Sequence, residues 1–125
     1  MAKDTYLTFS NTIEMFRINT RNVVYIQASG NYSELFTADG KRHELPMQLG
    51  QVEMKLDACL ENNPDAHFVR IGKQVIANVD YISYIHVSHK KLVLSDSHTF
   101  SFTLSPSVEA LKSLKDYLVK ETEQC

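Results

Sequence analysis

The sequence predicts a mainly β domain of antiparallel strands with one mid-chain helix and one C-terminal helix. Three observations support this fold class. Apolar and polar residues alternate with period two through the first 45 residues and again after residue 67. Tight turn signals separate the alternating segments, and Asp39-Gly40 is the strongest of them. Two other segments repeat their apolar residues every three or four positions, which is typical of amphipathic helices.

The chain is expected to form one domain over residues 1–125, with its core at about residues 11–119. Hydrophobic residues make up 43% of the sequence and charged residues 22%, which suffices for a packed core and excludes a disordered chain. No linker rich in Gly, Pro or Ser divides the sequence, and no internal repeat is found.

Five strands are predicted in the first half, where apolar residues alternate or run continuously: 6–10, 13–18, 23–28, 32–38 and 41–45. The run at 23–28 is rich in β-branched and aromatic residues, which is typical of a central strand. Ser29-Gly30-Asn31 predicts a turn after it, and Asp39-Gly40 predicts a hairpin between the last two strands.

The mid-chain helix is predicted from a change of period, with apolar residues at Leu49, Val52, Leu56 and then Cys59 or Leu60. Pro46 suits its start. Asn62-Asn63-Pro64 is expected to end it, because proline cannot continue a helix.

Five further strands are expected in the second half: 68–71, 75–77, 81–87, 92–94 and 100–104. A C-terminal helix follows, with Ser105 as the expected N-cap and Pro106 at the first helical position. Its apolar stripe comprises Val108, Leu111, Leu114 and Leu118.

The charge distribution is uneven although the net charge is only −2. Between residues 67 and 91 four cations face one acid, for a formal charge of +3: Arg70, Lys73, Lys90 and Lys91 against Asp80. Such a local basic patch is one property of nucleic-acid-binding surfaces. On charge alone, the favoured interpretation is an ordinary solvated face.

Several other classes of protein find no support. The longest apolar runs are far shorter than the roughly 18–20 residues that cross a bilayer, and no signal-peptide core is present, so a cytoplasmic protein without membrane insertion is expected. Cys59 and Cys125 are too few for a disulfide framework. His86 and His89 lie in a strand-and-hairpin segment without a nearby carboxylate or thiol, so we expect neither a metal nor another cofactor. No arrangement of nucleophile, base and acid indicates an enzyme.

Short segments follow one another in a particular order: an apolar strand with a small-residue turn, an Asp-Gly hairpin, a Leu-patterned helix, a Phe-x-Arg strand, a polar turn, and an apolar triplet followed by Asn and Ile. Here they are Val-Val-Tyr-Ile-Gln-Ala-Ser-Gly-Asn-Tyr at 23–32, Asp39-Gly40, Leu49 with Val52 and Leu56, Phe68-Val69-Arg70, Gly72-Lys73-Gln74, and Val75-Ile76-Ala77-Asn78 with Ile82. In this order and spacing, from about residue 11 to residue 118, the chain resembles the LytTR family of bacterial DNA-binding domains.

The resemblance implies an elongated antiparallel β fold that inserts loops into successive major grooves of double-stranded DNA. It also implies a bacterial transcriptional regulator that binds repeated sites as a homodimer. Many members of the family carry a receiver domain upstream. Only about 10 residues precede the first matched segment here, so a stand-alone domain is expected. Its regulation then falls to a protein partner, to oligomerisation or to expression level.

Three loops would carry recognition, and the first contains Asn31, Tyr32 and Ser33. Their amide and hydroxyl groups can bond to base edges or phosphates. In the alternative interpretation Gly30 and Asn31 only form the turn and Tyr32 packs inward.

The second loop is Gly72-Lys73-Gln74, where the family commonly has His-Arg-Ser and the middle residue reaches DNA. Lys73 occupies that place, and Gln74 follows it. Lysine lacks the planar fork of arginine, and Gly72 removes a side chain, so we expect reduced or altered base recognition. Arg70 is either a phosphate contact or a strand residue paired with an acid.

The third loop follows Leu104, where the family often has Ser-Arg. Ser105-Pro106-Ser107 lacks that cation, but Ser105 and Ser107 can still reach phosphates. Beside the three loops, His89, Lys90 and Lys91 at a hairpin turn are candidate phosphate contacts, or else protection for an edge strand.

Two functions remain open. The first is sequence-selective binding of double-stranded DNA by a transcriptional regulator. The second is a protein-interaction module on the same fold that has lost specific DNA recognition, as Gly72, Pro106 and the acidic remainder of the chain suggest.

Overall fold

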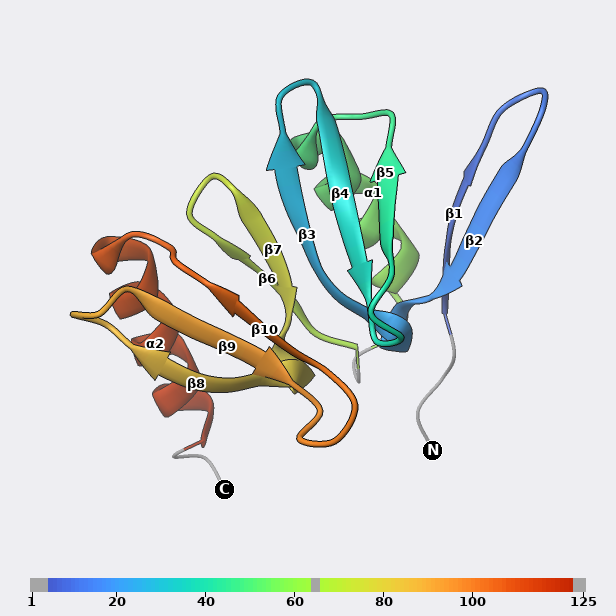
Figure 1. Cartoon of the computed structure of the whole chain (residues 1–125). Helices are drawn as coiled ribbons and strands as arrows, with labels where there is room; N and C mark the ends of the chain where they lie inside the picture. The colour runs from blue at the N-terminus through green and yellow to red at the C-terminus, as the bar shows by residue number, and fades with distance from the viewer. Residues whose placement is uncertain (1–4, 64–65, 123–125) are drawn as a thin grey trace.

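The computed structural model describes residues 5–63 and 66–122, so that Pro64 and Cys125 lie outside the described residues. It is mainly β, as the sequence predicts (Figure 1). The elements in chain order are β1 (Tyr6–Ser10), β2 (Met15–Asn19), η1 (Thr20–Asn22), β3 (Val23–Ser29), β4 (Tyr32–Thr37), β5 (Arg42–Leu45), α1 (Leu49–Leu60), β6 (Phe68–Ile71), β7 (Val75–Asn78), η2 (Val79–Tyr81), β8 (Ile82–His86), β9 (Lys91–Ser95), β10 (Ser101–Leu104) and α2 (Val108–Thr122).

The strands form three antiparallel sheets. A five-stranded sheet has the order β5-β4-β3-β7-β6, a three-stranded sheet has the order β10-β9-β8, and β1 pairs with β2 as a separate hairpin. Strand β3 lies at the centre of the larger sheet, and its residues from Val23 to Ile26 are at most 4% exposed. This agrees with the continuous apolar run in the sequence.

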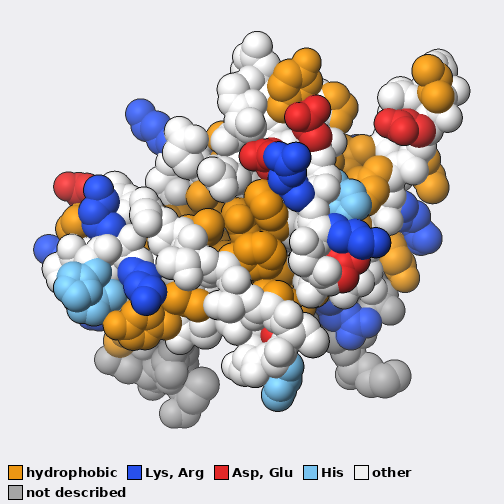
Figure 2. All heavy atoms as spheres, viewed as in Figure 1, with side chains coloured by type: hydrophobic (Ala, Val, Ile, Leu, Met, Phe, Trp, Pro, Cys, Tyr) orange, Lys and Arg blue, Asp and Glu red, His pale blue; other side chains and the backbone are white. Residues whose placement is uncertain are grey.

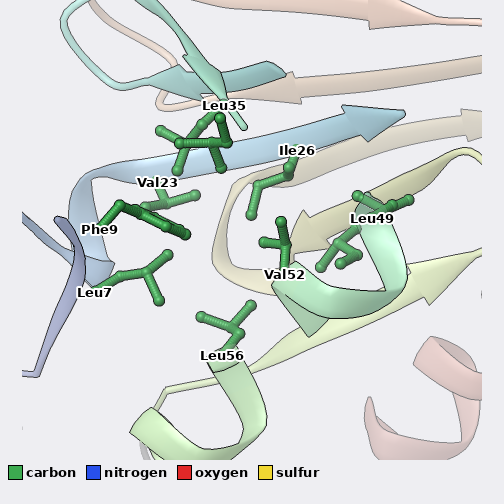
Figure 3. Close-up of a cluster of buried hydrophobic side chains, with 10 residues drawn as sticks. Leu7, Phe9, Val23, Ile26, Leu35, Leu49, Val52 and Leu56 are labelled. Atoms are coloured by element: carbon green, nitrogen blue, oxygen red, sulfur yellow. The ribbon is translucent and has the colours of Figure 1, made fainter. Parts of the chain in front are cut away.

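A shift of register in β3 divides the core into two clusters. The pairing of β3 with β4 shifts between Val23 and Tyr25, which is typical of a β-bulge. Val23 and Ile26 therefore pack in one cluster with α1, whereas Val24 and Tyr25 pack in the other with residues of β9 and α2. Figure 3 shows the first cluster, in which the side chains of α1 and β1 meet those of β3 and β4.

An aromatic group joins the larger sheet to the three-stranded sheet. Tyr25 and Phe36 stack at 4.3 Å between ring centroids, and the ring of Phe102 meets Tyr25 edge-on at 5.3 Å. Offset and edge-on pairs of this kind contribute about 0.5–1.5 kcal/mol beyond the area they bury. The contact fixes how β10 lies against β3 and β4.

Both helices begin later than expected from their prolines, because Pro46 lies before α1 and Pro106 lies before α2. Helix α1 begins at Leu49 after Gln48, whose backbone N–H donates to Gln51 Oε1 at 3.0 Å. Helix α2 begins at Val108, and its cap is Ser107, whose Oγ accepts from the Ala110 backbone at 3.2 Å. The expectation that Ser105 caps this helix is therefore wrong: Pro106 lies before the helix and not within it.

Cys59 is half-buried on α1, and its thiol donates to the Tyr6 carbonyl oxygen at 3.0 Å. Burial raises the pKa of the Cys59 thiol, with nearby Lys55 opposing the effect. A thiol shifted in this direction is a poor nucleophile.

Candidate nucleic-acid interface

Four connections lie at one edge of the molecule. In the larger sheet Ser29 pairs with Tyr32 and Gln27 pairs with Val75, so the β3–β4 turn and the β6–β7 turn leave the sheet at the same end. In the smaller sheet Leu104 pairs with Leu92, so the β10–α2 connection and the β8–β9 turn also share an end. Figure 1 shows these four connections along the upper left of the molecule.

A groove joins the two ends into one surface. It has a volume of about 490 Å³ and lies between the β6–β7 turn and the β10–α2 connection. Lys73 and Gln74 line it from one side, and Ser105 and Ser107 from the other. The structure thus brings the second and third predicted loops together. We call the four connections and this groove the turn edge.

The β6–β7 turn is held close to the β3–β4 turn. The Ala28 backbone N–H donates to the Gln74 carbonyl oxygen at 2.8 Å, which links β3 to the turn. Gly72 has a φ of +61°, a conformation in which glycine carries little strain. Lys73 and Gln74 are exposed, so both side chains are accessible to a ligand at the turn edge.

Asn31 and Tyr32 are exposed at the tip of the β3–β4 turn, and Tyr32 retains 50% of its surface. The inward packing considered for Tyr32 is therefore not observed. Gln48 Nε2 donates to Asn31 Oδ1 at 3.3 Å, which adds the β5–α1 connection to this edge. Sequence patterns give no sign of this contact, because it joins residues 17 positions apart through the tertiary fold.

The structure contradicts the prediction that Ser33 contacts DNA. Its side chain is fully buried at 0% exposure, and its hydroxyl donates to the Met47 carbonyl oxygen at 2.8 Å. A hydroxyl in that position is not accessible to DNA, so Ser33 is removed from the candidate contacts. Ser33 shares the inward face of β4 with Leu35 and Thr37. The sequence does not signal this, because Tyr32 and Phe36 make the other face of β4 equally apolar.

Arg70 is paired with an acid, which was one of its two expected roles. Its Nη1 lies 2.7 Å from Glu53 Oε1 on α1, and its Nη2 donates to the Lys73 carbonyl oxygen at 3.1 Å. The guanidinium therefore contacts a helix and the β6–β7 turn at the same time. Glu53 was not among the predicted site residues, because only the packing of α1 across the sheet brings it to Arg70.

The β8–β9 turn presents two histidines and two lysines. The rings of His86 and His89 stack at 3.7 Å between centroids, and the His89 backbone N–H donates to His86 Nδ1 at 3.2 Å. Lys90 is exposed and has a φ of +53°. The ammonium of Lys91 lies 5.8 Å from the ring centroid of Tyr84.

Charge on this surface is locally basic. Figure 2 shows Lys, Arg and His side chains projecting at the left of the molecule over the β8–β9 turn and the elements beside it. Acidic side chains occur nearby, and Glu109 lines a second groove of about 650 Å³ with Lys73 and Tyr117. The turn edge is therefore basic only in patches, and only a few of its cations are available to bind an anionic ligand.

Two other kinds of site find no support in the described part of the chain. Among residues 5–63 and 66–122, no three side chains of the His, Cys, Asp and Glu types are grouped to hold a metal ion. No helix within the same residues is long and apolar enough to cross a bilayer.

The arrangement defines a class: an antiparallel β domain that presents turns and basic residues along one edge. The family model for the LytTr DNA-binding domain matches residues 14–118. The chain therefore belongs to the LytTr DNA-binding domain family, in agreement with the resemblance seen in the sequence.

The fold is also similar to a solved structure, the LytTr DNA-binding domain of a protein from Bacillus cereus described as a methyl-accepting/DNA response regulator. The similarity has a TM-score of 0.61 and 17% sequence identity, and it covers 91% of this chain and 96% of that chain. Among curated proteins none matches this chain.

Proposed function

We propose that this protein binds double-stranded DNA with sequence selectivity and regulates transcription in a bacterial cytoplasm, with the turn edge facing the major groove. Membership of a DNA-binding domain family supports DNA as the ligand. The observation that carries the proposal is the convergence of four connections at one edge, joined by the groove beside Lys73.

The side chains divide into two groups by chemistry. Lys90 and Lys91 neutralise phosphates, and the hydroxyls of Ser105 and Ser107 add hydrogen bonds to the same backbone. Asn31, Tyr32 and Gln74 contact base edges, where amides and hydroxyls can distinguish donors from acceptors. Lys73 also reaches guanine O6 or N7 in this arrangement, although without the two-pronged geometry of arginine. His89 supports the β8–β9 turn through its bond to His86.

Binding as pairs on repeated sites is part of the proposal and follows from the family resemblance. Two copies on adjacent half-sites would place their turn edges on the same face of the duplex, about one helical turn apart. A regulatory protein partner would then act on surfaces away from the turn edge.

The test is selection of bound sequences from a random duplex pool at two salt concentrations, followed by affinity measurements with Lys73→Ala. We expect an enriched sequence, and we expect Lys73→Ala to weaken binding to it more than binding to random DNA, by about 1–3 kcal/mol. Lys41→Ala is the matched control, because Lys41 lies in the β4–β5 turn at the opposite end of the sheet. Equal weakening on both DNAs, with a salt slope lower by about one, would instead make Lys73 a phosphate contact.

The second candidate is a protein-interaction module. The tip of the β1–β2 hairpin favours it, since Ile13 is 92% exposed and Met15 is 62% exposed. Pro106 at the β10–α2 connection, where the family often has a cation, points the same way. Absence of salt-sensitive binding to random duplex near roughly 50 mM salt would contradict the DNA proposal and favour this one.

A further inference from the structure

Arg70 links helix α1 to the β6–β7 turn through two separate nitrogens. Nη1 bonds to the Glu53 carboxylate at 2.7 Å, and Nη2 bonds to the Lys73 main-chain oxygen at 3.1 Å. The two side chains are only partly accessible, at 30% for Arg70 and 37% for Glu53. Only a planar guanidinium presents donors at two ends in this fixed geometry, so lysine could not make both contacts.

The contacts restrain the turn from both sides. On one side the Gln74 carbonyl oxygen accepts from Ala28 of β3. On the other side the Lys73 carbonyl oxygen accepts from Arg70, which α1 holds through Glu53. Lys73 thus has its main chain fixed while its side chain is exposed at the turn edge.

The position of Glu53 is otherwise unfavourable for a DNA-binding surface. A carboxylate close to the β6–β7 turn repels phosphates and lowers affinity for any DNA. Its pairing with Arg70 compensates the negative charge, but it also occupies a cation that would otherwise attract phosphates. Order in the turn is a contribution that a single charge could not make.

We propose that Glu53 and Arg70 are positioning residues: neither contacts DNA, and together they fix the β6–β7 main chain so that the Lys73 side chain meets one base position. This inference rests on the proposed function for its ligand. It differs from a phosphate-contact role for Arg70, in which the charge alone would matter.

Two variants separate the alternatives. Arg70→Lys keeps the charge but loses one of the two contacts, so positioning predicts lower selectivity, whereas a phosphate contact predicts unchanged selectivity. Glu53→Ala removes a negative charge, so electrostatics alone predicts tighter binding to all DNA. Positioning predicts instead that the ratio of affinities for the selected and random duplexes falls at least about fivefold, the lower end of what one base contact provides.

Asp57→Ala is the matched control, because it removes the same charge from an exposed site one turn further along α1. We expect it to leave the affinity ratio unchanged. A second readout needs no DNA. The Ala28 amide donates to the Gln74 carbonyl oxygen of the turn, so its hydrogen exchange should become several-fold faster in Arg70→Lys and Glu53→Ala and remain unchanged in Asp57→Ala.

Faster exchange together with a lower affinity ratio supports the inference. Unchanged exchange, or an unchanged ratio in both variants, would overturn it. If the unaltered chain itself prefers no sequence, the proposed function is contradicted, and the exchange rates still decide whether Glu53 and Arg70 order the turn.

Discussion

Lys90 occupies a backbone conformation that glycine adopts with less strain. Its φ of +53° follows a tight turn in which the Lys90 N–H donates to the Val87 carbonyl oxygen at 3.0 Å. Left-handed geometry costs a non-glycine residue about 1–2 kcal/mol. A cation held at such a cost, at the turn edge, is consistent with a role for its charge in binding.

We therefore expect Lys90→Gly to change stability and DNA binding in opposite directions. Relief of strain, partly offset by the greater freedom of glycine in the unfolded chain, should raise the free energy of unfolding by about 0.5–1 kcal/mol. Loss of one phosphate contact should lower the slope of log affinity against log salt by about one. Urea unfolding and fluorescence anisotropy at several salt concentrations measure the two effects.

Ser97→Gly provides the control for this prediction. Ser97 also has a positive φ, of +69°, but it lies in the β9–β10 connection, away from the turn edge. Stability should rise as in Lys90→Gly while DNA affinity stays constant. A loss of affinity in both variants would mean that turn flexibility, and not the charge of Lys90, controls binding.

Single residues also show the limits of inference from sequence. Asn31, Tyr32 and Lys73 lie exposed at turns, as their polar character and neighbouring glycines predict. Alternation in β4 does not predict the burial of Ser33, because both faces of this strand carry apolar residues. The contacts of Gln48 and Glu53 could not be predicted either, because each depends on how α1 crosses the sheet.

Strand β3 shows how one element organises the rest. Period two alone places Tyr25 on the same side of the strand as Val23. Because of the bulge, Tyr25 instead packs in the cluster that contains Val24, against Phe36 and Phe102. Burial raises the pKa of Tyr25 to about 12, and the nearby charge of Glu34 acts in the same direction.

This pKa predicts a loss of stability at alkaline pH. The Tyr25 phenol ionises near 10 in the unfolded chain and near 12 in the folded protein, so its contribution is full below pH 10 and is lost as pH rises toward 12. The contribution is about 2–3 kcal/mol, at about 1.4 kcal/mol per pH unit. Tyr25→Phe should therefore show a correspondingly smaller fall in unfolding free energy between pH 10 and 12, measured by urea titration. Parallel pH curves for the two proteins would contradict the buried phenol.

Local pattern predicts elements better than it predicts their assembly. Periodicity locates the strands and both helices, because alternation and three-to-four spacing follow directly from backbone geometry. The division into three sheets has no local signal, since it depends on which strand edges meet. The sequence predicts Ser105 as the N-cap of α2, whereas Ser107 is the N-cap in the structure. Either serine can cap a helix, and only packing selects between them.

The molecule as a whole carries a net charge of −2, so its attraction to DNA must come from where the charges lie. The turn edge gathers Lys73, Lys90 and Lys91, while the opposite end of the sheets carries Asp39, which is paired with Lys41, and the Asp96 turn. Hydrogen bonds from Thr99 and neighbouring backbone amides hold the pKa of Asp96 well below its usual range, so that this turn stays anionic. In the proposed function this distribution of charge places the turn edge against the DNA, and it predicts strong weakening of binding by salt.

The most direct measurement of the turn edge as the binding surface is an NMR titration of the isotopically labelled chain with its selected duplex. We expect amide shifts at residues 30–32, 72–74, 89–91, 105 and 107, and none at residues 39–41 or 96–99. Shifts confined to those last two segments, or to the tip of the β1–β2 hairpin, would contradict the account.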